Sequence, residues 1–127
     1  MSKEHWKAEP DDHDYPAAAS YLALVLPGPL VDAVVAELRV APIEHFKAKD
    51  LLRASGLQLL PVDNPHVSSD LKKVKTGVML SPVLLVRGSM KKAGPLQIAD
   101  GYHRICASYH VDENADIPCR MAEDPTG

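Results

Sequence analysis

The first third of the chain carries apolar residues at helical spacing. Asp14 followed by Pro16 is typical of a helix start, because a proline in the first turn has no N–H group to satisfy. A helix is therefore predicted from Asp14 to about Leu26, where Pro27-Gly28-Pro29 ends it. Apolar residues then recur at helical spacing at Leu30, Val31, Val34, Val35 and Leu38. This pattern predicts a second, amphipathic helix and hence an antiparallel helical pair.

After Pro42 the predicted elements become shorter. Strands are predicted at residues 43–48, 81–87, 96–99 and 117–121, and helices at residues 51–55, 68–76 and 102–110. Asp50 is expected to cap the first of these helices and Ser68 or Ser69 the second. Residues 88–94 predict a hairpin loop between two strands. Because strands and helices neither alternate strictly nor segregate, the order predicts an α+β fold with a small mixed β-sheet.

The chain divides into two predicted segments that form one compact unit. Residues 1–42 are expected to form an arm and the helical pair, packed on the body, and residues 43–127 the sheet-containing domain. Residues 1–13 are polar and lack a period, which predicts a loose arm from which Trp6 docks on the body. The tail from Glu123 is expected to be frayed.

Length and composition indicate one soluble domain. A chain of 127 residues with 46% hydrophobic residues is large enough to bury a sizeable core. No apolar run is long enough to span a membrane, and the polar start lacks the hydrophobic region of a signal peptide. We therefore expect a cytoplasmic protein without membrane association. Cys106 and Cys119 are too few for a disulfide framework and are expected to be buried thiols.

The sequence from Asp100 to Arg104, Asp-Gly-Tyr-His-Arg, follows an apolar run and opens a predicted helix. Gly101 permits a turn that a side chain would forbid. The first N–H groups of a helix lack partners within it, and the helix dipole adds partial positive charge there. His103 and Arg104 can add side-chain donors. The turn predicts a phosphate or carboxylate pocket; the alternative is an ordinary strand-to-helix connection with a solvent-facing arginine.

Charge is distributed unevenly around this turn. The whole chain carries a formal charge of −3, which argues against a surface coated with basic residues for nucleic acid. Residues 47–104 carry a net charge of +6, residues 1–46 carry −5 and residues 105–127 carry −4. A basic centre between acidic ends is compatible with a phosphate-binding surface.

Three stretches follow one another in a recognisable order: residues 64–88, beginning Asn-Pro and ending in an apolar strand, residues 96–110 with the Asp-Gly-Tyr-His-Arg turn, and residues 115–121 with Ile-Pro. This succession resembles the ParB/sulfiredoxin-like superfamily of nucleotide-binding and ParB-like nuclease domains. In that superfamily a helix after an Asn-Pro or similar loop, a strand and a hairpin lead to a DGxHR turn, and a further strand closes the fold. The resemblance covers about residues 43–121.

The resemblance implies nucleotide or phosphate binding. In sulfiredoxin-like members the residues corresponding to Gly101, His103 and Arg104 hold ATP phosphates, helped by the helix corresponding to residues 68–75. In ParB-like members this region binds CTP, and some relatives are nucleases or a free-serine kinase. Sulfiredoxins carry their catalytic cysteine where this chain has Tyr102, so sulfiredoxin chemistry is not expected. A helix-turn-helix and dimerisation domain, as in ParB partition proteins, is also not expected here.

Together, the turn and the resemblance predict a protein that binds a nucleotide, with Mg²⁺ as a possible companion, or another phosphorylated ligand. The predicted phosphate-binding residues are Gly101, Tyr102, His103, Arg104, Ser68, Ser69 and Lys72, and the pocket rim is predicted at Asn64, His66 and Lys47. Asp100 and His103 are the candidate catalytic residues for phosphoryl transfer or hydrolysis. Asp100 is suited to orient His103, to accept a proton from a substrate hydroxyl or to hold Mg²⁺.

Two other functions remain open from the sequence. The first is a non-catalytic interaction protein, for example a homodimer packed through the two N-terminal helices. The second is a Mg²⁺-dependent nuclease, which the acidic net charge disfavours without excluding nucleic acid as a partner. His103, Cys106 and His110 fall on one face of the predicted helix and, with Cys119, are candidate ligands for zinc. Its spacing matches no common structural zinc motif, so no metal site is assigned.

Overall fold

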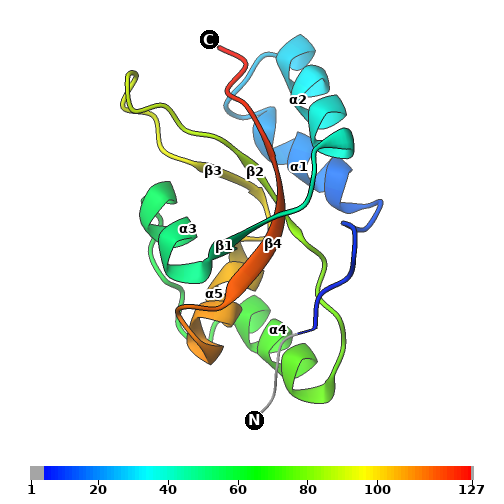
Figure 1. Ribbon diagram of the computed structural model, residues 1–127, viewed down its shortest axis with the longest axis vertical. Coiled ribbons are helices and arrows are strands. Elements are labelled where there is room, and N and C mark those ends of the chain that lie inside the picture. Colours follow the sequence, from blue (N-terminus) through cyan, green and yellow to red (C-terminus); the bar gives the residue numbers. More distant parts are fainter. Residues whose placement is uncertain (1–4, 127) are drawn as a thin grey trace.

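The computed structural model describes residues 5–126, which form an α+β fold (Figure 1). The helices are α1 (Asp14–Leu22), α2 (Gly28–Val40), α3 (Ala48–Ser55), α4 (Pro65–Thr76) and α5 (Tyr102–Val111). The strands are β1 (Glu44–Lys47), β2 (Val83–Val86), β3 (Gln97–Asp100) and β4 (Asp116–Ala122). No helix within the described residues is long and apolar enough to cross a membrane.

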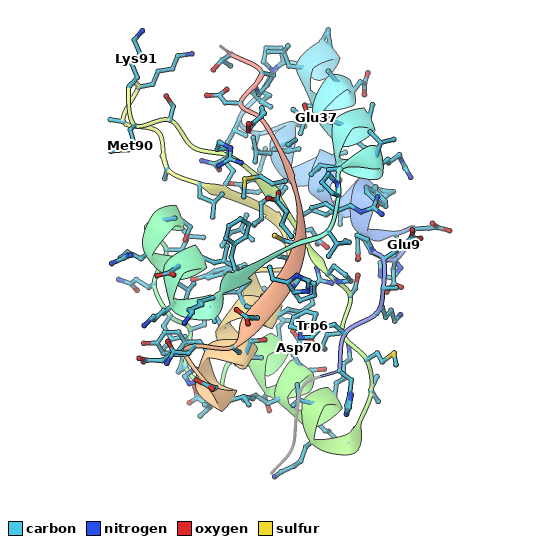
Figure 2. The ribbon with its side chains drawn as sticks, viewed as in Figure 1. Trp6, Glu9, Glu37, Asp70, Met90 and Lys91 are labelled. Carbon is cyan, nitrogen blue, oxygen red and sulfur yellow. The ribbon has the colours of Figure 1, made fainter. Side chains whose placement is uncertain are left out.

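The four strands form one mixed sheet in the order β1-β4-β2-β3. β2 and β3 are an antiparallel hairpin, and β4 lies parallel to β2 and antiparallel to β1. The hairpin loop extends away from the helices, with Met90 and Lys91 at its tip (Figure 2). The four predicted strands, the hairpin and the mixed sheet are therefore confirmed, with strand bounds shifted by at most two residues.

Helices cover both faces of the sheet (Figure 1). Successive strand residues point to opposite faces, and on β2 this separates two apolar clusters. Val83 and Leu85 pack with α3, α4 and α5, whereas Leu84 and Val86 pack with α1 and α2. The end of β3 therefore lies between two helical layers, where the chain enters α5.

The predicted helical pair is present, but its first helix is shorter than predicted. α1 ends at Leu22 and not near Leu26. The N–H groups of Leu24 and Val25 bond to carbonyls three residues back, so the chain leaves the α-helix in a turn. Pro27 favours this exit, because a proline disfavours helical geometry in the residue before it.

The N-terminal arm is bound to the body wherever the structure describes it, so the prediction of a loose arm is wrong for residues 5–13. The Leu80 N–H donates to the His5 carbonyl and the Lys7 N–H donates to the Leu80 carbonyl, both at 2.8 Å. Trp6 packs against the apolar cluster on the α3 and α5 side, as expected for its docking. Residues 1–4 of the predicted arm lie outside the described residues.

Two helices begin earlier than predicted. α4 begins at Pro65, not at Ser68 or Ser69, because the Asn64 side chain accepts hydrogen bonds from the backbone N–H groups of His66 and Val67. Similarly, α3 begins at Ala48, so Asp50 lies in its first turn and does not cap it.

The C-terminal tail is more ordered than predicted. Glu123 forms an ion pair of 2.7 Å with Arg87, and its backbone N–H donates to the Glu37 carboxylate at 2.9 Å. The expectation that the chain frays from Glu123 is therefore wrong for this residue.

Candidate functional site

A cavity of about 410 Å³ opens beside the turn that follows β3. The start of α1 contributes His13, Asp14 and Ala17; α4 contributes His66, Ser69, Asp70 and Lys73; the turn and α5 contribute Asp100, Gly101, His103 and Arg104. The turn predicted from the sequence therefore lines a cavity, and it does so together with part of the N-terminal helical pair.

Gly101 turns the chain from β3 into α5. Its φ angle of +109° is one that residues with side chains rarely adopt. A Cβ atom at this position would lie 2.4 Å from Cγ1 of Val83, so close packing also requires glycine. No side chain caps the start of α5, because the N-cap residue is Gly101. The first backbone N–H groups of the helix follow directly after this turn. The helix start therefore places donors and partial positive charge beside the cavity.

Arg104 is held between two carboxylates. Its Nη2 donates to Oδ2 of Asp100 at 2.6 Å, and its Nη1 lies 3.6 Å from Oδ2 of Asp14. The Arg104 side chain is only 13% exposed. A guanidinium group that serves two carboxylates has fewer donors left for a ligand. Arg104 thus connects α1, β3 and α5, and its contact with a ligand is restricted to the donors that remain.

Asp14 faces this cavity and does not act as the cap of its own helix. It is 4% exposed, and its Oδ2 accepts hydrogen bonds from the Ser81 hydroxyl and, at 3.0 Å, from the Asp11 backbone N–H. The same N–H of Asp11 lies 3.1 Å from the Ser81 hydroxyl oxygen. This small network ties the start of α1 to the entrance of β2 and brings a buried negative charge to the site.

Asp100 lines the cavity beside Arg104, as a candidate catalytic residue should. Burial raises the pKa of its carboxyl, Arg104 lowers this pKa, and the negative charge of Asp14 raises it. Two carboxylates that share one guanidinium leave a negative charge unbalanced. Asp100 is therefore suited to exchange a proton with a ligand.

His66 and His103 lie against each other in the cavity wall. Their ring centroids are 4.7 Å apart and the rings are tilted by 46°. Burial lowers the pKa of His103, a charge on His66 lowers it further, and Asp70 raises it. At neutral pH His103 is therefore uncharged and has one ring nitrogen that donates and one that accepts. The structure therefore brings together His66, which was predicted at the pocket rim, and His103, which was predicted to contact phosphate.

Two pairs of adjacent residues of α4, Ser68 with Ser69 and Lys72 with Lys73, are divided between two surfaces. Ser69 and Lys73 line the cavity, and the Lys73 ammonium lies 3.7 Å from Oδ1 of Asp70. Ser68 and Lys72 line a separate depression on α4. Neighbouring residues on a helix are rotated by about 100°, whereas residues four apart share a face. Of the three phosphate-binding residues predicted on α4, Ser69 lines the cavity, whereas Ser68 and Lys72 do not. Lys73, which was not predicted, lines the cavity as well.

Three other predicted site residues do not line the cavity. The Tyr102 hydroxyl donates to the carbonyl of Gln58. Asn64 caps α4, and Lys47 ends β1 at the position just before α3. Asn64 supports the site indirectly, because the helix that it caps carries His66, Ser69 and Lys73.

The candidate zinc ligands His103, Cys106, His110 and Cys119 do not form a convergent group. Cys106 and Cys119 are buried free thiols, and burial raises the pKa of Cys106 and raises that of Cys119 to about 12, with a contribution from the charge of Glu44. Among the residues that the structure describes, the group of three or more potential ligands whose atoms converge is a different one, made by Asp11, His13 and Asp14. A ring nitrogen of His110 lies 2.7 Å from the Leu60 carbonyl oxygen.

Another group of potential ligands occurs near the cavity. Within the described residues, Asp11, His13 and Asp14 bring ligand atoms within 4.8 Å of one another. The Asp14 carboxylate already accepts hydrogen bonds from Ser81 and from the Asp11 backbone, and it faces the Arg104 guanidinium. This arrangement gives the group no independent sign of a metal, and we assign none.

Sequence reasoning missed Asp14, Ser81 and Lys73 as parts of this site. Asp14 has the appearance of an ordinary helix start, and Ser81 that of a strand entrance before Pro82. Lys73 is one of three lysines on α4, and the packing of the helix decides which of them faces the cavity. Asn64-Pro65 is typical of a cap followed by the first helical residue, so it signals where α4 begins but not which of its faces lines the cavity.

Comparison with known proteins does not add to this description: no protein-family model, curated protein or solved structure matches the chain. The functional argument therefore depends on the cavity itself.

Proposed function

We propose that this chain binds a nucleotide or another phosphorylated small molecule in the cavity at the start of α5, and that it is a member of the ParB/sulfiredoxin-like superfamily. One observation supports this most. Residues from two of the stretches that resemble the superfamily line one open cavity at the N-terminus of a helix: His66, Ser69, Asp70 and Lys73 from the first, and Asp100, Gly101, His103 and Arg104 from the second. Such a helix end favours an anion through its free N–H groups and its dipole.

The donors available to a phosphate come from two helices. The first N–H groups of α5 are joined by the Ser69 hydroxyl and the Lys73 ammonium from α4. The rings of His66 and His103 add donors that strengthen when they are protonated. A phosphate in this position accepts several hydrogen bonds without requiring Arg104 to leave its two carboxylates.

The charge of the cavity restricts the form of the ligand. Asp14, Asp70 and Asp100 oppose the two permanent cations, Lys73 and Arg104, among the lining residues. A free nucleoside triphosphate is strongly anionic and is disfavoured by the surplus carboxylate. We therefore expect nucleotides to bind better with Mg²⁺, which offsets phosphate charge and takes oxygen ligands.

The first experiment is a thermal-shift panel of CTP, ATP, ADP, GTP and inorganic phosphate, each with and without Mg²⁺. A ligand at about one hundred times its Kd stabilises the fold by about 2.7 kcal/mol, which raises the Tm of a domain of this size by several degrees. A selective shift supports the proposal and identifies the ligand class. A panel in which no ligand raises the Tm contradicts it.

Adjacent residues of α4 provide matched controls for the position of the site. Lys73→Ala is expected to weaken the binding of the selected ligand about tenfold or more, because it removes a charged donor from the cavity. Lys72→Ala removes the same side chain one position away and should leave the Kd unchanged. Ser69→Ala and Ser68→Ala form a second pair of this kind. Equal effects within each pair would place the ligand elsewhere.

For phosphoryl transfer or hydrolysis, we propose Asp100 and His103 as the catalytic residues. Both line the cavity, and the neutral His103 ring can accept a proton near neutral pH. Assays for released phosphate with the ligand selected above test this. His103→Gln should abolish any turnover of the ligand, whereas the Kd of the ligand should change by a smaller factor.

A further inference from the structure

The strongest unexplained feature of the site is Asp14, which lies outside the segment that resembles the superfamily. It is 4% exposed, lines the cavity and lies 3.6 Å from the Arg104 guanidinium. Ser81 and the Asp11 backbone N–H hold its carboxylate in place. A structural helix start does not require a buried charge at this depth, because burial of an ionised group is costly unless it is paired.

The Arg104 guanidinium is shared by Asp14 and Asp100. One positive charge between two carboxylates leaves the trio with a surplus negative charge, and this charge faces the cavity in which we place the phosphate. Charges interact more strongly in partly buried surroundings than in water. The trio therefore opposes an anionic ligand for as long as both carboxylates are ionised.

Other charged and titratable groups face the same space. His13, beside Asp14, approaches its Oδ1 to 3.5 Å, and Asp11 pairs with Lys7. From α4 and α5 the cavity receives His66, Asp70, Lys73 and His103. The carboxyl that is closest to accepting a proton is Asp100, whose pKa is raised by burial and by the charge of Asp14, against the effect of Arg104.

We propose that Asp14 is a positioning residue that couples the site to protons: with Asp100 it holds Arg104 in the cavity wall, and an anionic ligand binds together with a proton taken up by this carboxylate pair. The inference rests on the proposed function. Uptake of one proton neutralises the trio, so by linkage the bound anion and the added proton favour each other.

The test compares the Kd of inorganic phosphate for the full chain and for Asp14→Asn between about pH 5 and 8. The ratio of the two Kd values removes the ionisation of phosphate itself and, to first order, that of the histidines. The asparagine variant lacks the surplus charge, so it should bind phosphate roughly tenfold more tightly at the upper pH. The ratio should fall toward one as the pH is lowered, because the wild-type pair takes up its proton and loses the surplus charge. Weaker binding by Asp14→Asn, or a ratio independent of pH, would show a purely structural role.

A second variant decides the matter if Asp14→Asn does not fold. Ser81→Ala keeps the charge of Asp14 but removes one hydrogen bond from its ionised form, so the proton should bind the pair more readily. The pH dependence of the phosphate Kd should then shift to higher pH, and an unshifted dependence overturns the inference. If the wild type binds no phosphate but binds a nucleotide of the panel, that nucleotide is the probe. If the wild type binds neither phosphate nor a nucleotide, the proposed function fails. If it binds a ligand without the expected pH dependence, only the inference about Asp14 fails.

Discussion

Gly101 combines a backbone requirement with a packing requirement, and the two can be measured separately. Gly101→Ala forces a side chain into a φ of +109° and places its Cβ 2.4 Å from Cγ1 of Val83. We expect a loss of about 2 kcal/mol or more in the free energy of unfolding, from backbone strain and from steric overlap. Urea denaturation followed by circular dichroism measures this loss.

Gly77→Ala is the matched control for the backbone part. Gly77 ends α4 with a φ of +79°, but a Cβ there meets no atom within 4 Å. Its replacement should therefore cost only the strain of the left-handed conformation, about 1 kcal/mol. Equal losses for the two variants would mean that Val83 moves away without cost and that close packing does not require glycine at position 101.

At the scale of the element, α4 is the helix on which the site depends most. Its cap, Asn64, accepts hydrogen bonds of 3.0 and 3.2 Å from the N–H groups of His66 and Val67. Asn64→Ala should lower the free energy of unfolding by about 1 kcal/mol and increase fraying of the first turn, where His66 lies. Urea denaturation measures the first effect, and amide hydrogen exchange of residues 66–69 measures the second. Asp63→Ala changes the preceding exposed residue and should alter neither.

The elements were predicted well where a local pattern determines them. Glycine at position 101, the apolar run of residues 83–86 and the hairpin loop each have a local physical cause, and the structure contains all three. For α4 the sequence predicts a start at Ser68 or Ser69, because serine is a good cap, whereas the structure shows that Asn64-Pro65 is the stronger signal. That error of three residues shortens the predicted helix but changes the direction of no side chain. Which of the three lysines faces the cavity depends on how α4 packs on the rest of the protein.

The site was predicted in part because it is made by segments distant in the sequence. His103 and Gly101 are local to the turn, and the sequence identified them. The partnership of Arg104 with Asp14 spans 90 positions and depends on how α1 packs on the sheet, which no local pattern specifies. For the same reason Arg104 was expected to be free for a ligand, whereas the structure holds it between two carboxylates.

At the scale of the whole molecule, the two faces of the sheet are connected through its strands. Leu84 belongs to the cluster with α1 and α2, and its neighbour Leu85 to the cluster with α3, α4 and α5. Disturbing one cluster therefore alters the strand that supports the other. The Asp14 to Arg104 contact adds a second connection between the N-terminal helices and the rest of the site.

Leu38→Ala tests whether this connection makes the chain a single cooperative unit. Leu38 is fully buried on α2, so its truncation should lower the free energy of unfolding by about 2–5 kcal/mol. Trp6, the single tryptophan, packs on the opposite cluster, so its fluorescence reports on the face without the substitution. We expect the midpoint measured by Trp6 fluorescence to fall as far as the midpoint measured by circular dichroism, because one transition governs both faces. If Trp6 kept its wild-type midpoint while circular dichroism showed an earlier loss of helix, the N-terminal pair would unfold separately, and the cavity would lose Asp14 before the sheet unfolds.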